Sequence, residues 1–230
     1  MITLLCVLMA DLRLPEVRLP APPVLIQEMP VPTRDELERD LGFPIKDERL
    51  PKISDKLRRQ IRAVWRMYGP KELRAQSNLA LAQILAESRG KADAVSPVGA
   101  RGLGQIMPAT ARGYGVEVDQ LFDPGVNLLV WAKHMRFLHG FVNSSRRLAN
   151  PEPHPHNLHL WSWMLVGYNA GHSISLKSNR GREQGVGRLV RLGRPIDSRG
   201  LYEVLPFIRK DTYHEPRGYL ARIYGYWLGI

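Results

Sequence analysis

The segment SNLALAQILAESRG, residues 77–90, constrains the fold more than any other part of the sequence. Read as a helix, it is apolar on nearly every side, and its charged residues, Glu87 and Arg89, lie only at its C-terminal end. A helix of this kind has to be covered by other elements on most of its surface. We therefore expect a central core helix, with Ser77 as its N-cap and Gly90 as its C′ residue.

The rest of the chain is also helical in pattern, so the predicted fold class is mainly α. Asp123 and Pro124 are expected to begin one helix and Gly140 to end it, with a loop at residues 141–157. Residues 171–200 are rich in Gly, Arg and Ser and indicate a long loop. No strand pattern or internal repeat is visible. The other predicted helices lie at about residues 33–42, 54–69, 107–115, 158–171 and 216–229.

Proline sets the N-terminal part of the chain apart. Residues 1–53 hold eight of the 18 prolines, which predicts an extended arm ahead of one domain at residues 54–230. The arm is apolar, so we expect it to lie in a groove of its own domain or of a partner protein. Residues 2–10 are apolar but too short for a transmembrane anchor. No Lys or Arg precedes them, which favours a docking segment over a secretory signal.

The net charge of +11 predicts attraction to an anionic partner, which could be nucleic acid, a membrane surface or cell-wall polymer. Basic residues gather between Lys177 and Arg222, but few aromatics and no nucleic-acid motif accompany them, so we expect no specific nucleic-acid binding. His154, His156 and His159 lack the i,i+4 spacing of helical metal ligands. We expect no metal and no cofactor.

Glu87 is the candidate for chemistry. Burial in an apolar helix disfavours its charged form, and the negative end of the helix dipole does so again. Both effects raise its pKa, as a general acid requires. The alternative interpretation is a solvated glutamate that pairs with Arg89 or Lys91.

Glu87 also begins a spaced pattern that runs without insertion to Ala111. The pattern resembles the lysozyme-like lytic transglycosylase family, the catalytic domain of soluble bacterial and phage peptidoglycan transglycosylases. That family has Glu-Ser, a short gap, Ser-Pro, Gly-Ala-x-Gly-Leu-Met-Gln and Pro-x-Thr-Ala. The residues in register are Glu87, Ser88, Ser96, Pro97, Gly99, Ala100, Gly102, Leu103, Gln105, Pro108, Thr110 and Ala111.

Two later blocks agree with the resemblance, which covers about residues 72–228. GYNAG at 167–171 is similar to the family's Ala-Tyr-Asn-Ala-Gly, and HEPRGYL at 214–220 is similar to its Glu-Thr-Arg-x-Tyr-Val. In the second block Pro216 and Leu220 depart from the family. Gly104 departs as well, since the family usually has Met there, and we expect a lost packing side chain and a wider subsite. The implied fold is the goose-type, lysozyme-like helical domain.

The resemblance implies a role for two residues in the reaction. Glu87 would be the single acid and base, which protonates the bond between N-acetylmuramic acid and N-acetylglucosamine. It would then take the proton of the 6-hydroxyl as a 1,6-anhydro ring closes. Tyr168 is expected to hydrogen-bond near Glu87 and hold its orientation. The alternative for Tyr168 is a core tyrosine.

Four further residues are predicted to bind substrate. Ser96, Gln105 and Asn169 would read the acetamido groups, and Glu215 would add negative charge near the cationic centre. Ser96 could instead be a turn residue before Pro97, and Glu215 could pair with a nearby arginine.

The function predicted is therefore a peptidoglycan lytic transglycosylase for local cell-wall penetration. A hydrolytic goose-type lysozyme is one alternative, and an inactive docking protein with a lysozyme-like domain is another. We expect the chain to belong to a phage tail or ejection apparatus, bound there through its N-terminal arm and acting in the host periplasm. The alternative location is the bacterial periplasm.

Overall fold

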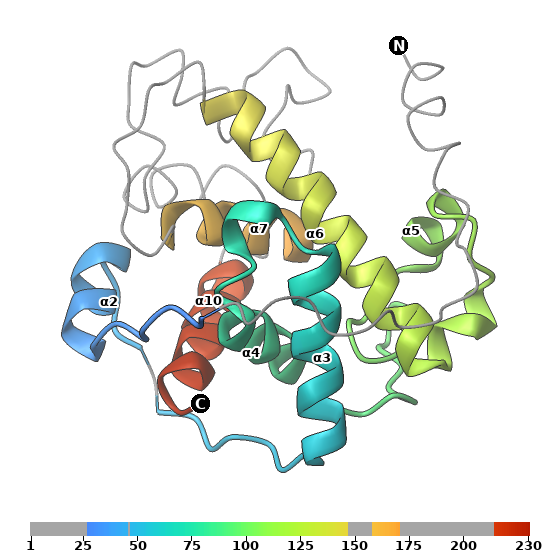
Figure 1. Cartoon of the computed structure of the whole chain (residues 1–230), viewed down its shortest axis with the longest axis horizontal. Coiled ribbons are helices and arrows are strands. Elements are labelled where there is room, and N and C mark those ends of the chain that lie inside the picture. The colour runs from blue at the N-terminus through green and yellow to red at the C-terminus, as the bar shows by residue number, and fades with distance from the viewer. Residues whose placement is uncertain (1–26, 46, 147–157, 171–213) are drawn as a thin grey trace.

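The computed structural model describes residues 27–45, 47–146, 158–170 and 214–230. These ranges contain no β-strand, only isolated antiparallel bridges that join Arg101 to Val95 and to Ile106. The mainly helical fold class is confirmed (Figure 1). The helices are α2 (Arg34–Leu41), α3 (Asp55–Tyr68), α4 (Ser77–Ser88), α5 (Pro108–Gly113), α6 (Pro124–Arg146), α7 (Leu158–Ala170) and α10 (His214–Leu228), with 3₁₀ turns at Lys71–Leu73 and Val118–Phe122.

Helix α4 is the core helix that the sequence predicted. Every residue from Leu79 to Leu85 is buried. Helices α3 and α10 pack directly against α4, and α6 and α7 complete the surrounding helices (Figure 1). The apolar character of α4 on all sides is thus explained by cover from several helices, and its last turn brings Glu87 out of this core.

The N-terminus of α4 differs from the prediction. Gln76 is the N-cap residue, and Ser77 is already helical. The carboxylate of Glu28 accepts hydrogen bonds from the Ser77 hydroxyl and from the Asn78 amide nitrogen. Ser77 was a wrong choice because this cap comes from a distant segment that no local pattern reveals.

Residues 27–45 and 47–53 pack onto the helical domain. Helix α2 begins at a capping box of Thr33 and Glu36 and ends at Gly42, as the sequence predicted. The segment buries side chains in the same core as α4; these are Leu37, Leu41, Phe43 and Ile45. The first 26 residues of the predicted arm lie outside the described residues.

Helix α6 begins as predicted but ends later. Asp123 Oδ1 accepts the Val126 amide, and Pro124 is the first helical residue. The helix continues through Gly140 to Arg146, so the predicted end at Gly140 is wrong. Glycine inside a helix costs only about 1 kcal/mol, and the burial of Val142 in the core beyond it favours continuation. The rest of the predicted loop, residues 147–157, and the predicted loop at 171–200 lie outside the described residues.

Three tryptophans pack together and join α3, α6 and α7. The ring of Trp65 on α3 lies 4.9 Å from that of Trp161 on α7 and 5.3 Å from that of Trp131 on α6. Each indole nitrogen donates a hydrogen bond to a buried acceptor. Because buried polar groups are costly when unpaired, these bonds fix how the helices pack. No described helix combines the length and apolar character that crossing a lipid bilayer requires.

Candidate active site

Glu87 lies where the core helix reaches the surface. Its side chain is partly buried, and Ser88 beside it is buried. The helix ends at once because Arg89 and Gly90 both adopt positive φ, of 56° and 80°. A Cβ at Gly90 would lie 2.3 Å from Ile53 Cγ2, so this turn has no room for a side chain. The backbone therefore holds Glu87 at a sharply defined helix end.

Tyr219 of α10 contacts the Glu87 carboxylate. The Tyr219 hydroxyl donates a hydrogen bond to Glu87 Oε1, and its ring is buried. The sequence indicated Tyr168 as the tyrosine that hydrogen-bonds near Glu87, but the bond to the carboxylate itself comes from Tyr219. Helix α10 packs along α4, whereas α7, which carries Tyr168, packs mainly against α6 and α10. Tyr219 was visible in the third sequence block, but nothing in that block indicated its partner.

The carboxyl group of Glu87 has a strongly raised pKa. Burial raises the pKa to about 8, against the smaller lowering effects of the Tyr219 hydroxyl and the Arg222 guanidinium. The predicted direction is confirmed, with burial as its main cause. A carboxyl group with this pKa keeps its proton at neutral pH and is able to donate it.

Tyr168 lies near Glu87 but bonds elsewhere. Its hydroxyl donates a hydrogen bond of 2.5 Å to the carbonyl oxygen of Gly104. Burial, and then the nearby Glu87 charge, raises the pKa of Tyr168 well above its ordinary value. Its ring also lies 5.6 Å from that of His134 on α6. Tyr168 thus ties α7 to the loop after α4, and its role in catalysis stays a prediction.

Ser96 and Gln105 both shape the loop between α4 and α5. Ser96 Oγ accepts the Ala100 amide at 3.0 Å, which agrees with its alternative as a turn residue. Gln105 has a φ of 49°, and its amide nitrogen donates to the carbonyls of Ala94 and Gly102, at 3.2 and 3.0 Å. These bonds fold the loop back on itself. Substrate binding by either residue stays a prediction.

Asn127 on α6 anchors this loop, a role that was not predicted from the sequence. Its side chain donates to the carbonyls of Arg101 and Leu121 and accepts the Gly104 amide at 2.7 Å. The loop approaches so closely that a Cβ at Gly102 would lie 2.2 Å from the Asn127 side chain. A buried Asn with three backbone partners carries no sequence signal of its own, apart from being polar in an apolar run.

The sequence predicted that Gly104 widens a subsite, but the space beside Gly104 is filled. A Cβ there would lie 3.1 Å from Trp131 Cβ and 3.3 Å from Asn127 Oδ1. The position faces the α6 side chains rather than an opening. The backbone of Gly104 is also bonded on both sides, by Asn127 and by Tyr168. The departure from the family's Met is therefore accommodated by the packing of α6.

Two other predicted residues lie at the edges of the described structure. Asn169 is partly buried in the last turn of α7. Glu215 is in the first turn of α10, and its side chain lies outside the described part, as do His154 and His156. Over the ranges that the structure describes, no group of three or more His, Cys, Asp or Glu side chains could hold a metal ion.

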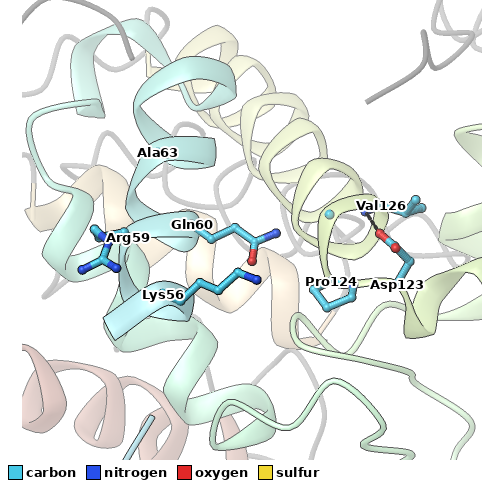
Figure 2. Close-up of a pocket in the computed structure, with 8 residues that line it drawn as sticks. Lys56, Arg59, Gln60, Ala63, Asp123, Pro124 and Val126 are labelled. Atoms are coloured by element: carbon cyan, nitrogen blue, oxygen red, sulfur yellow. Dashed lines mark hydrogen bonds between the residues drawn. The ribbon is translucent and has the colours of Figure 1, made fainter. Parts of the chain in front are cut away.

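A separate hollow of about 800 Å³ lies between α3 and the start of α6 (Figure 2). Lys56 and Arg59 line it from α3, and Asp123 and Pro124 line it from the other side. Asp123 is exposed and already caps α6 by accepting the Val126 amide. The carboxyl group that lines this hollow is already bonded to the backbone of α6, so the group around Glu87 is the better candidate.

A protein-family comparison matches residues 67–187 to the transglycosylase SLT domain. The match covers just over half of the 230-residue chain. The chain belongs to the transglycosylase SLT family. This confirms the predicted family, and peptidoglycan is the substrate that such a domain implies. Comparisons with curated proteins and with solved structures gave no match.

The site of this SLT domain extends beyond the matched segment. The match includes Glu87, the loop that follows it and Tyr168. Tyr219, which contacts Glu87, lies 32 residues past its end at residue 187. Helix α10 is therefore needed to complete the group around the acid, although the family match stops before it.

Proposed function

We propose that this chain is a lytic transglycosylase that cleaves the β-1,4 bond between N-acetylmuramic acid and N-acetylglucosamine and leaves a 1,6-anhydro product. One observation carries the proposal: the SLT domain holds a partly buried carboxyl group, Glu87, whose pKa is raised to about 8. The group is protonated at neutral pH and is reachable from the surface.

In the first step Glu87 gives its proton to the glycosidic oxygen. The bond from C1 of the muramic acid to that oxygen breaks, and its electron pair stays on the leaving N-acetylglucosamine as a hydroxyl group. Positive charge develops at C1, where the oxygen of the 2-acetamido group stabilises it. Tyr219 stabilises the carboxylate that Glu87 has become, by donating to Oε1.

In the second step the 6-hydroxyl oxygen of the same sugar forms a bond to C1. Its proton returns to Glu87, so the acid is restored and no water is consumed. Most glycosidases need a second carboxylate to activate water or to attack C1. Asp93 is the only other carboxylate between Glu87 and Gly115 in the sequence, and it is exposed. This supports a route that uses the substrate's own groups.

We propose that Tyr168, Ser96, Gln105, Asn169 and Glu215 act around this centre. Tyr168, bonded to the Gly104 carbonyl, would keep the loop closed against α7. Ser96 and Gln105 would present the edge of that loop to the acetamido groups. Asn169 follows Tyr168 in α7 and would contact the same sugar.

The mass of the product tests the reaction. An intramolecular 6-hydroxyl has an effective concentration of up to about 10⁵–10⁸ M in well-oriented cases, so it should capture C1 ahead of water. Digested sacculi should therefore release glycan that ends in anhydromuramic acid, one water lighter than a lysozyme product. Mass spectrometry of the released muropeptides measures this directly.

Glu87→Gln is the matched control for that digest. It keeps the size and one acceptor oxygen but has no proton to give, and a lost general acid lowers turnover by about 10²–10⁴-fold. A wild-type digest dominated by reducing ends would instead assign a hydrolytic lysozyme. Folded wild-type protein that releases nothing would assign the inactive docking protein.

We further propose that the chain works within a phage tail or ejection apparatus, acting on the cell wall in the periplasm. The support is in the sequence: residues 1–26 are apolar and rich in proline, and the net charge of +11 suits an anionic wall polymer. Leu37, Leu41, Phe43 and Ile45 pack in the chain's own core, so we assign the docking role to residues 1–26.

A further inference from the structure

Gln83 is a polar residue where the core helix is otherwise apolar. It lies four residues before Glu87 on α4, one helical turn away on the same face, and it is fully buried. Its side-chain amide contacts Trp131 and Met135 of α6 and Tyr219 of α10. A buried amide is costly unless its partners satisfy it, so these contacts decide how the side chain sits.

The indole of Trp131 fixes which way the amide of Gln83 faces. An indole nitrogen only donates, so the atom that it contacts at 3.1 Å must be the amide oxygen, Oε1. The amide nitrogen is then left for Tyr219 Oη at 3.4 Å and for the sulfur of Met135 at 3.5 Å. Each polar atom of the Gln83 amide therefore has a partner.

The orientation of the Gln83 amide also sets the donor and acceptor in the hydrogen bond between Tyr219 and Glu87. The amide nitrogen of Gln83 only donates, so the Tyr219 oxygen accepts from it. The Tyr219 proton is then directed to Glu87, where Oε1 accepts it. A protonated Glu87 that accepts at Oε1 carries its own proton on the other oxygen, Oε2.

We propose that Gln83 is a positioning residue that fixes the direction of the hydrogen bonds from Trp131 through Tyr219 and so keeps the Glu87 proton on Oε2, ready for the glycosidic oxygen. The consequence for catalysis rests on the proposed function, but the effect on Glu87 does not. Without the amide, the Tyr219 hydroxyl is able to turn and accept the Glu87 proton on Oε1. The proton would then point into the protein.

Gln83→Met tests the proposal, because it keeps the side-chain length and removes the amide. Gln76→Met is its matched control. Gln76 is also a buried glutamine that accepts from an indole, that of Trp161 at 2.9 Å, and it lies at the far end of α4, roughly 16 Å from Glu87 along the helix. Both variants leave one indole unpaired and should lose similar stability.

The readout is the titration of Glu87 followed by ¹³C NMR of the side-chain carboxyl, with the resonance assigned by its loss in Glu87→Gln. Gln83 donates to Tyr219 and so strengthens the Tyr219 bond to the carboxylate. Its removal should weaken that bond and raise the pKa of Glu87 above the wild-type value. The alkaline limb of the pH–activity profile should move up with it, and the plateau below pH 8 should fall about three- to ten-fold.

The outcomes separate cleanly. A raised pKa of Glu87 in Gln83→Met and an unchanged pKa of Glu87 in Gln76→Met support the proposal. An equal pKa of Glu87 in both variants and in the wild type overturns the proposal, whatever happens to activity. If Gln83→Met does not fold, Trp131→Phe is the second variant. It leaves the Gln83 amide free to turn over and should raise the pKa of Glu87 by a smaller amount. A chain that shows these shifts but releases no anhydro product would refute the proposed function alone.

Discussion

At the scale of single residues, the raised pKa of Glu87 supplies a protonated acid but makes the stability of the fold depend on pH. Its ordinary pKa of 4.5 applies in the unfolded chain, and burial raises it to about 8 in the folded one. Between these values the folded state keeps a proton that the unfolded state has lost. The wild-type protein therefore loses stability as the pH rises from about 4.5 to about 8.

Glu87→Gln should remove this loss, because glutamine has no proton to release. We expect its melting temperature to equal that of the wild type near pH 4 and to exceed it near pH 8 by on the order of 10 °C, since the pKa difference is worth at most about 5 kcal/mol and each kcal/mol is worth about 2–4 °C in a chain of this size. Calorimetric melts at a series of pH values measure the difference. Asp93→Asn, which neutralises an exposed carboxylate, should show no such gain. A constant difference across the pH range would contradict the raised pKa.

At the scale of elements, α4 depends on a residue from the N-terminal segment. The Glu28 carboxylate accepts from the Arg66 guanidinium at 2.7 Å and also contacts Ser77 and Asn78 at the start of α4. Negative charge at a helix N-terminus is favourable, and so is an acceptor for its unpaired amides. Glu28 thus joins the start of α4 to α3 while the other end of α4 carries the acid.

Glu28→Ala should therefore loosen the first turn of α4. We expect it to lower stability by about 1 kcal/mol, as lost helix caps do, and to speed amide exchange at residues 78–80. Hydrogen exchange by mass spectrometry checks both the place and the size of the effect. Glu36→Ala is the comparison, because it removes the capping box of α2 and should speed exchange there instead. Unchanged exchange at residues 78–80 would show that the Glu28 cap is dispensable.

At the scale of the whole molecule, the helical domain begins before residue 54. Leu37, Leu41, Phe43 and Ile45 are buried in the same core as α4, and each fully buried side chain of this kind is worth about 1.5–3 kcal/mol. A Glu48 carboxylate oxygen lies 3.5 Å from the guanidinium of Arg222 on α10, the same helix that carries Tyr219. The boundary for a stable fragment therefore lies nearer residue 27 than residue 54.

Two truncations separate docking from folding. Removal of residues 1–26 should keep the melting temperature and the proposed cleavage of sacculi, but under the proposed docking role the shortened chain should fail to enter the proposed assembly. Removal of residues 1–50 should lower the melting temperature by more than about 5 °C, because the core side chains are lost. Calorimetry and co-purification with the native particle measure the two effects. Entry of the chain without residues 1–26 would refute docking through that segment.

The sequence by itself determined what depends on neighbours along the chain. The apolar run of α4 required a central helix, and the caps Thr33 and Asp123 were readable because a cap and its amides lie within three residues. The spaced residues from Glu87 to Ala111 indicated the family, which the SLT match confirms. The raised pKa of Glu87 was also predictable, because burial follows from an apolar helix.

Only the tertiary structure decided which distant groups meet. Tyr168 and Tyr219 are both tyrosines in family-like blocks, and the packing of α10 along α4 brings Tyr219 to the acid. Gln83 and Glu28 gain their partners in the same way, across 38 or more residues of sequence. A hydrogen bond requires atoms within about 3.5 Å, and that distance is set by helix packing rather than by spacing along the chain.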